Sequence, residues 1–295
     1  MSEQQAAPTT FQRSCRHWSE QSAGEMAAFY RLAAYDYTLL ADATDWGAEL
    51  TRLSQGSSGD TLSLLDVACG SGKFPAALLA SDRFRAYAGK PIDYSLLDPS
   101  DFSLREAAAQ LAPPFGVGRS FHCTLQDLNP PRRHDVVWAT HALYCVPVEE
   151  LPAAAERFCA ALNPGGLGFI AQATGSSHYL AFQRLYLDHW PGASGARFST
   201  ADQVAAAMQQ AGAAAFGDAW RWRASTIDYE GTLPLGDTTT AEMYLQRCLF
   251  DDEVTLDQML SNERLGDYLR RCQDQDAGVW RFPQQTMLMR FGSRG

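Results

Sequence analysis

The segment 62–76 reads as a buried strand that breaks into a glycine turn and then continues as a helix. The apolar run over 62–67 is typical of a central strand in a parallel sheet. Gly70 and Gly72 follow at once, and glycine lets the backbone approach a ligand where a Cβ would collide. Amides of the helix beyond Gly72 would face the polar end of that ligand. The segment therefore predicts an α/β sheet that binds a nucleotide-like cofactor.

The residues after the turn narrow the choice of cofactor. A dinucleotide fingerprint has a third glycine that packs helix against strand. Here Lys73, Phe74, Pro75 and Ala76 follow Gly72, so no third glycine and no Walker-type Gly-Lys-Ser/Thr is present. A nicotinamide oxidoreductase is disfavoured, although it stays an alternative, as does an ordinary turn between strand and helix.

The same stretch resembles motif I of class I methyltransferases that depend on S-adenosylmethionine (SAM). Asp66, Gly70 and Gly72 match the motif Asp/Glu-x-Gly-x-Gly-x-Gly, with Ala68 in place of its first glycine. The resemblance implies a Rossmann-like sheet of seven strands, SAM as the cofactor, and cofactor contacts at those three matching residues.

The net charge and the distribution of cysteines indicate which kinds of binding partner are unexpected. The net charge is −10, from 24 Lys and Arg against 34 Asp and Glu, and no basic run appears. Nucleic acid is an unexpected partner, because phosphate neutralisation supplies most non-specific affinity. The seven cysteines are scattered without a Cys-x-x-Cys pair, so they indicate neither disulfides nor a metal site. No apolar run approaches the ~18 residues of a membrane span. These features predict a soluble, cytoplasmic protein, and they leave open whether it is a monomer or a homodimer.

Alternating strand and helix signals predict a doubly wound parallel sheet. Residues 1 to about 12 are expected to be disordered, and a helical region runs on to about 53. Expected strands lie at 62–68, 92–98, 119–124, 134–140 and 166–173, with helices at 73–81, 101–111 and 148–162. Beyond them come helices at 177–190, 200–211, 239–250 and 254–273, and two late strands at about 219–229 and 279–292.

This pattern predicts two regions. Residues 1–60 form an N-terminal helical region on the substrate side. Residues 61–295 form the cofactor-binding domain, with a helical insertion at about 230–278. The pair of late strands matches the antiparallel strands of class I methyltransferases.

Polar residues at the predicted strand ends are candidates for the site. Asp98 ends the second strand, where a carboxylate binds ribose hydroxyls in doubly wound folds, although Asp98 also suits a helix cap. Gln126 and Asp127 follow the third strand, where the family contacts adenine, and a surface turn explains Asp127 almost as well.

The fourth strand ends in a second polar group. Thr140, His141 and Tyr144 should border the methyl-transfer site, because ligands bind at the carboxyl ends of such strands. His141 titrates near neutral pH when unperturbed, so it is a candidate proton acceptor as well as a substrate contact. A lone histidine after a strand is often structural instead.

Several short stretches also resemble the histamine N-methyltransferase group. They include 97–100, 142–146, 174–177, 198–202 and 282–287. This resemblance implies that Asp36 is the substrate carboxylate, beside Tyr37, and that His141, Tyr144 and Gln285 contact substrate. It places SAM contacts at Gly70, Asp98, Ser103, Gln126 and Thr140. Four changes (Glu to Asp36, Gln to His141, Asn to Gln285, Tyr to Cys145) mean that histamine itself does not follow.

The prediction is therefore an enzyme that methylates a small-molecule amine, amino acid or imidazole on nitrogen. In-line displacement at a sulfonium needs alignment and exclusion of water rather than a covalent nucleophile. Asp36 would hold a cationic end and His141 would accept a proton, whereas a solvated helix aspartate is the alternative for Asp36. S-methylation of a thioether, O-methylation of a hydroxylated metabolite, and a catalytically idle SAM-binding or interaction protein stay open.

Overall fold

The computed structural model describes residues 9–129 and 133–293, and one mixed sheet organises them. Its order is β3-β2-β1-β4-β5-β8-β6, with β7 paired to β8. The strands are β1 (Leu62–Val67), β2 (Ile92–Leu97), β3 (Phe115–Phe121), β4 (His134–Thr140), β5 (Leu162–Ala173), β6 (Trp220–Pro234), β7 (Gln273–Asp274) and β8 (Val279–Ser293). The first five run parallel, and β8 is antiparallel to both β5 and β6. The predicted α/β fold and its late antiparallel strands are confirmed.

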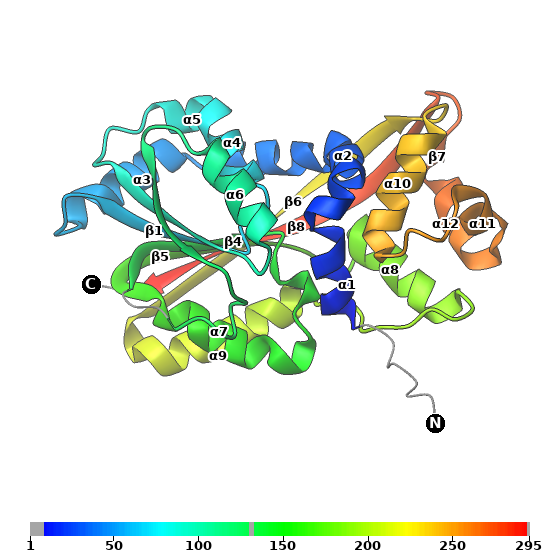
Figure 1. Cartoon of the computed structure of the whole chain (residues 1–295). Coiled ribbons are helices and arrows are strands. Elements are labelled where there is room, and N and C mark those ends of the chain that lie inside the picture. Colours follow the sequence, from blue (N-terminus) through cyan, green and yellow to red (C-terminus); the bar gives the residue numbers. More distant parts are fainter. Residues whose placement is uncertain (1–8, 130–132, 294–295) are drawn as a thin grey trace.

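Helices cover both faces of the sheet (Figure 1). They are α1 (Thr10–His17), α2 (Ala23–Asp42), α3 (Trp46–Gly56), α4 (Lys73–Ala80), α5 (Asp82–Arg85), α6 (Asp101–Gln110), α7 (Leu151–Ala160), α8 (His178–His189), α9 (Ala201–Phe216), α10 (Thr238–Leu249), α11 (Leu256–Ser261) and α12 (Glu263–Arg271). One core joins α7 and α9 to the sheet through residues such as Val137 and Phe158. The other joins α3, α4, α5 and α6 through residues such as Trp46 and Trp138. Since β1 is buried along its whole length, its apolar run is explained by two-sided packing.

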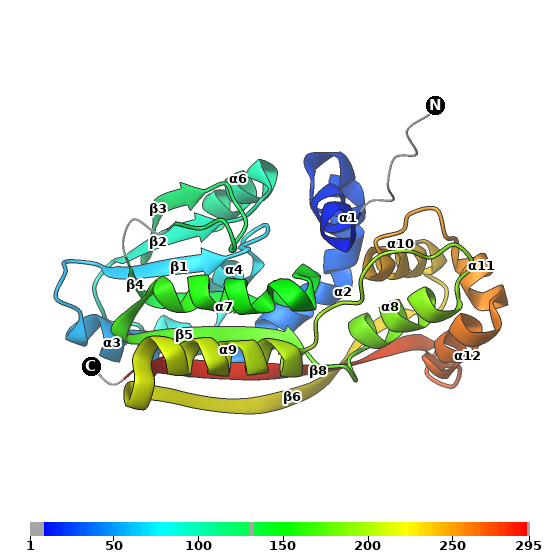
Figure 2. The same cartoon turned by 90° about the horizontal axis from the view of Figure 1, so that it is seen from below.

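The long strands β6 and β8 extend past the parallel strands, and α8, α10, α11 and α12 gather on that extension (Figure 2). A third core there includes Tyr244, Leu265 and Trp280. The helices between β6 and β8 thus pack on the ends of the same sheet. No helix of the described residues is long and apolar enough to cross a membrane.

Some expected elements differ from the structure at their ends or in their continuity. The third strand is Phe115–Phe121 rather than 119–124, because Phe115 packs against Tyr94 and Phe84 at its start. The helix expected at 148–162 begins with a 3-10 turn at Val148–Glu150. The strand expected from 166 begins at Leu162, with an irregular register before Val136 of β4. The helix expected over 254–273 is two helices, because the Asn262 side chain caps the second one.

The prediction of disorder at the N-terminus was wrong where the structure describes it. Residues 1–8 lie outside the described residues, but 10–12, which were expected to be disordered, form the first turn of α1, and the rest of α1 falls in the predicted helical region. A capping box explains this start, because the side chains of Thr9 and Gln12 each bond the other's backbone amide.

Candidate active site

A cavity of about 170 Å³ lies at the carboxyl ends of β1, β2, β4 and β5. This is the crevice in which doubly wound sheets bind their ligands. Helices α1, α2, α8 and α10 supply its other walls, through Phe11, Tyr30, Tyr179 and Cys248 among others. Segments far apart in the sequence therefore meet around one enclosed space.

Asp98 and the glycine turn form one end of the cavity. The Asp98 carboxylate accepts hydrogen bonds from the amides of Gly70 (3.0 Å) and Ser100 (2.8 Å). Each of its oxygens keeps further acceptor capacity, which ribose hydroxyls can use. Burial raises the pKa of Asp98 to about 6, although these backbone hydrogen bonds lower it.

Gly70 has a positive φ of 52°, and a Cβ there would point toward the hydroxyl of Tyr30 across the cavity, 3.8 Å away. A side chain at this turn would be strained and would take up ligand space. The turn and Asp98 therefore fit the ribose and adjoining part of a nucleoside cofactor. Ser103, Gln126 and Thr140 line the same cavity, as predicted.

Asp36 of α2 lines the other side of the cavity and is buried. The hydroxyl of Tyr179 donates to its Oδ2 at 2.9 Å. Burial raises the pKa of Asp36 to about 7, and hydrogen bonds from Tyr179 and Tyr229 act in the opposite direction. No Lys, Arg or His of the described residues forms an ion pair with Asp36. The carboxyl is therefore placed to receive a cation from the cavity.

His141 follows β4 with a left-handed φ of 51°, which is unusual for a residue other than glycine. Its amide donates to Ala171 of β5 at 2.8 Å, and its ring meets Tyr37 edge-on at 5.7 Å. Burial lowers the pKa of His141 to about 4. The prediction that it titrates near neutral pH is corrected, because the imidazole is neutral there.

Aromatic rings surround the space between these polar groups. Tyr144 packs edge-on against Phe198 with ring centroids 5.0 Å apart, and it stacks on Phe250 at 6.3 Å. Trp18, Phe29 and Tyr179 line the cavity as well. Such a wall favours a flat or apolar ligand body with a few polar ends.

Comparison with known proteins identifies the family. A family model described as a methyltransferase domain matches residues 38–215. The chain belongs to this family. No curated protein matches the methyltransferase in sequence. The family match and the fold confirm the prediction of a SAM-dependent methyltransferase of class I.

Two solved structures share the fold of this methyltransferase. Magnesium protoporphyrin IX methyltransferase from Synechocystis PCC 6803, determined with bound S-adenosylhomocysteine (SAH), has a TM-score of 0.55 and 12% identity, covering 96% of this chain and 100% of that chain. A protein of Bacillus halodurans described as a methyltransferase has a TM-score of 0.53 and 14% identity, covering 84% of this chain and 100% of that chain. At these identities the likeness concerns the fold.

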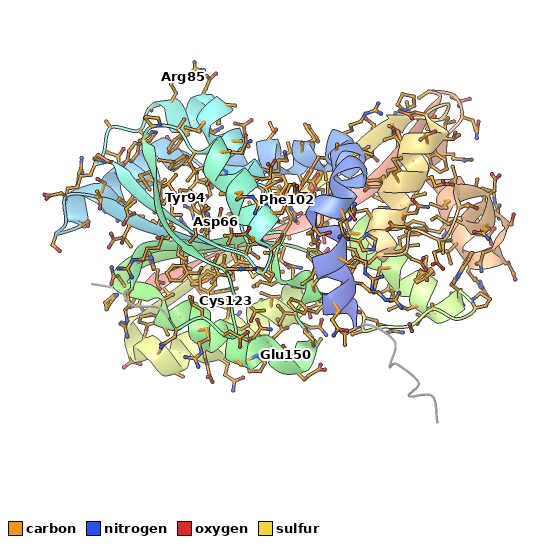
Figure 3. The ribbon with its side chains drawn as sticks, in the orientation of Figure 1. Asp66, Arg85, Tyr94, Phe102, Cys123 and Glu150 are labelled. Atoms are coloured by element: carbon orange, nitrogen blue, oxygen red, sulfur yellow. The ribbon has the colours of Figure 1, made fainter. Side chains whose placement is uncertain are left out.

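Three predicted cofactor residues of the methyltransferase do not line the cavity. Asp66 turns into the core, where the hydroxyl of Tyr94 donates to it at 2.6 Å (Figure 3). Gly72 lets α4 approach α6, since a Cβ there would lie 2.9 Å from the Cα of Ala107. Asp127 closes a turn with Thr124, whose hydroxyl donates to it at 2.7 Å. These three residues stabilise the elements that surround the cavity, and their side chains do not form its wall.

Gln285 is also absent from the cavity wall. Its amide group donates to Asp228 at 2.8 Å and accepts from Thr174 at 2.9 Å. Both ends of the amide are therefore engaged in joining β8 to β6 and to the end of β5. The structure does not bring Gln285 to Asp36 and His141.

Several residues at the site were missed from the sequence. Gln172, Tyr179 and Arg247 line the cavity of the methyltransferase, as do Trp18 and Phe250. Gln172 could have been found from the sequence, because it is a polar residue inside the otherwise apolar stretch 169–173 of a buried strand. The aromatic residues gave no such signal, since they follow ordinary helix and loop patterns.

Proposed function

We propose that this enzyme transfers the methyl group of SAM to a nitrogen of a small-molecule amine, amino acid or imidazole. The observation that carries the proposal is Asp36, a buried carboxyl that faces the cavity and has tyrosine hydroxyls instead of a cation as partners. A buried carboxylate without a cation is costly, and a bound ammonium would offset this cost. The resemblance to the histamine N-methyltransferase group supports the same class of acceptor, although not histamine itself.

When bound, SAM supplies an electrophilic methyl group on a sulfonium. Gly70 and Asp98 would hold its ribose region, with Ser103, Gln126 and Thr140 around the remainder. Asp36 would hold the cationic end of the acceptor, and the neutral His141 would accept a hydrogen bond from the attacking nitrogen. The aromatic residues would exclude water and hold the acceptor in line, which is the main need of this displacement.

The low pKa of His141 supports the choice of nitrogen rather than oxygen as the attacking atom. A hydroxyl acceptor gains from a base near neutral pKa, and the pKa of His141 lies at about 4. S-methylation of a thioether is the second candidate, because an ammonium on Asp36 serves a thioether amino acid equally well.

Two measurements test the proposal. Calorimetry with SAM and SAH tests the cofactor site, and absence of binding would overturn the proposal at its base. Mass spectrometry of products from a panel of amines, amino acids, imidazoles, thioethers and alcohols then identifies the methylated atom. We expect N-methyl products, whereas methylation of thioethers or alcohols alone would overturn the choice of nitrogen.

A further inference from the structure

Gln172 lies on β5 where the strand reaches the cavity, and it is 0% exposed. Its Nε2 donates to the carbonyl oxygen of Ser199 at 3.2 Å. Its Oε1 is buried and has no hydrogen-bond partner within 9–129 and 133–293. An unpaired buried acceptor destabilises the folded state, so such an atom at a ligand cavity points to a donor on the ligand.

The orientation of this amide is fixed by its surroundings. Ser199 is itself held, because its amide donates to the carbonyl of Tyr144 at 2.8 Å and its hydroxyl to that of Val146 at 2.6 Å. Reversing the Gln172 amide would set Oε1 against the Ser199 carbonyl, acceptor against acceptor. Oε1 is therefore the atom that Gln172 offers to a ligand.

A second such atom belongs to the neighbouring strand. Thr140 of β4 pairs with Ala171 of β5, so His141 and Gln172 come next along the two strands. The Nε2 of His141 is also buried and without a partner in the part of the chain that the structure describes. With its proton on Nδ1, the neutral ring presents Nε2 as an acceptor. In this tautomer, two acceptors occupy the ends of neighbouring strands.

We propose that Gln172 determines acceptor specificity, by accepting through Oε1 a hydrogen bond from an N–H of the attacking nitrogen. The inference rests on the proposed function and narrows its substrate class to amines that carry N–H, above all primary amines. A neutral primary amine has two hydrogens and one lone pair. Gln172 and His141 take the two hydrogens, which leaves the lone pair free to face the methyl group. A tertiary amine or a thioether has no hydrogen for Gln172.

Atoms and electrons are conserved in the proposed methyl transfer. The nitrogen lone pair forms the new N–C bond, and the electron pair of the breaking C–S bond stays on sulfur, which becomes the neutral thioether of SAH. The positive charge passes to nitrogen, and the methylated ammonium loses a proton to solvent. Gln172 changes neither its protonation nor its charge, so it is a positioning residue for this step.

Binding of matched probes to the enzyme saturated with SAH tests the inference. The probes are 3-(2-aminoethyl)aniline and 4-(2-aminoethyl)aniline, each paired with its counterpart in which the aniline nitrogen is dimethylated. Every probe keeps an ammonium for Asp36 and a neutral aniline nitrogen. The dimethylated nitrogen has no N–H and carries two methyl groups, so the effect of the hydrogen bond is taken from the comparison between protein variants on the primary amine. Calorimetry compares the unaltered enzyme with Gln172→Leu and with a matched control, Gln183→Leu. Gln183 is equally buried, both ends of its amide are bonded, and it does not line the cavity.

We expect all three proteins to bind SAH alike, which also shows that they are folded. At least one primary diamine should bind Gln172→Leu about tenfold more weakly than the unaltered enzyme, as expected for loss of one hydrogen bond. Gln183→Leu should leave this affinity within twofold, and the dimethylated probes should bind all three proteins weakly. The same loss should appear in KM rather than kcat when the amine is methylated.

Other results would overturn the inference. Equal binding of primary and dimethylated probes, or unchanged affinity in Gln172→Leu, would remove Gln172 from acceptor selection while leaving methyl transfer intact. SAH binding with no affinity for any probe would overturn the amine class together with the role of Gln172. Failure of the unaltered enzyme to bind SAH would instead overturn the proposed function.

Discussion

At the scale of single residues, Asp36 sets the expected pH dependence of acceptor binding. Burial raises the pKa of Asp36 to about 7, so the carboxyl becomes ionised as the pH rises through 7. A cationic acceptor binds the ionised form, so its KM should fall as the pH rises from about 6 to 8. Asp36→Asn should raise KM about 10–100-fold at pH 8 and remove this pH dependence, since a charged hydrogen bond contributes about 1.5–3 kcal/mol.

A matched control separates this effect from general loss of charge. Asp228 is exposed on β6 and accepts from Gln285 outside the cavity. Asp228→Asn should leave KM and its pH dependence unchanged. A similar loss in both variants would count against Asp36 as the acceptor anchor.

Asp98 is the residue on which we expect cofactor affinity to depend most. Asp98→Ala removes the acceptor of the Gly70 and Ser100 amides as well as the proposed ribose contact. SAH affinity should fall about 10–100-fold by calorimetry. The side chain of Asp127 does not line the cavity, although its turn carries Gln126, so Asp127→Ala should weaken SAH binding far less than Asp98→Ala does. If Asp127→Ala lost SAH affinity and Asp98→Ala kept it, Asp127 would again be the candidate for the adenine contact.

At the scale of elements, the N-terminal segment joins the two sides of the cavity. The hydroxyl of Ser100 donates to the carbonyl of Trp18 at 3.1 Å on the sheet side. On the other side Arg247 of α10 donates to the carbonyls of His17 and Ser22, the latter at 3.4 Å. The Arg247 guanidinium also lies 5.3 Å from the centre of the Trp18 ring, a cation–π contact. Both walls of the cavity thus depend on α1 staying in place.

Arg247→Met should therefore loosen α1 while leaving the sheet intact. The substitution keeps most of the buried volume but leaves two backbone carbonyls without their donor, at a cost of about 2 kcal/mol. Hydrogen exchange should become faster in Thr10–His17 and unchanged in β1 and β4. Uniformly faster exchange throughout the protein would show that Arg247 stabilises the whole fold instead.

The sequence predicted elements best where periodicity and burial agree. β1 and β4 were predicted to within a residue, because both are buried on two faces and bounded by turns. The edge strand β3 was misplaced, since Gly116 and Gly118 interrupt its pattern and Val117 is 58% exposed. The cap at Asn262 was overlooked because the helical pattern of the sequence continues across it. In the structure the Asn262 backbone is extended and its side chain accepts hydrogen bonds from the amides of Arg264 and Leu265.

At the scale of the whole molecule, buried carboxyls should make folding stability depend on pH. The pKa of Asp66 is raised to about 7 by burial, so the folded state binds its proton more tightly than the unfolded state does. Its contribution is full below the unfolded pKa of 3.8 and is lost as the pH rises through 7. Asp36 and Asp98 act in the same direction.

Asp66→Asn should remove the share of this pH dependence that belongs to Asp66. An asparagine oxygen still accepts from Tyr94 but does not ionise. Denaturant unfolding should show that the unaltered enzyme loses stability between about pH 5 and pH 8. The variant should lose about 2 kcal/mol less over the same range, because one pKa unit corresponds to about 1.4 kcal/mol. Equal falls in both proteins would contradict the raised pKa of Asp66.

The sequence predicted the site less completely than the fold, because tertiary packing decides which side chains reach the cavity. Gly70, Asp98 and Thr140 were predicted because they follow strands, and strand ends meet at one edge of a parallel sheet. Gln285 also comes from a strand, but tertiary packing engages its amide between Thr174 and Asp228. Tyr179 and Arg247 reach the cavity from helices whose placement depends on the extension of β6 and β8. No local pattern encodes that placement.

The extent of the family match has a consequence for how such an enzyme diversifies. The match covers residues 38–215 and so includes Gly70, Asp98 and His141, whereas Asp36, Trp18 and Arg247 lie outside it. The cofactor turn and the two acceptor contacts proposed on strand ends, His141 and Gln172, thus lie inside the match, whereas the proposed acceptor anchor Asp36 lies in a flanking stretch that shares the cavity. Exchange of that flanking stretch is therefore expected to change which charged end of an acceptor is bound, while Gly70, Asp98 and Gln172 keep their places.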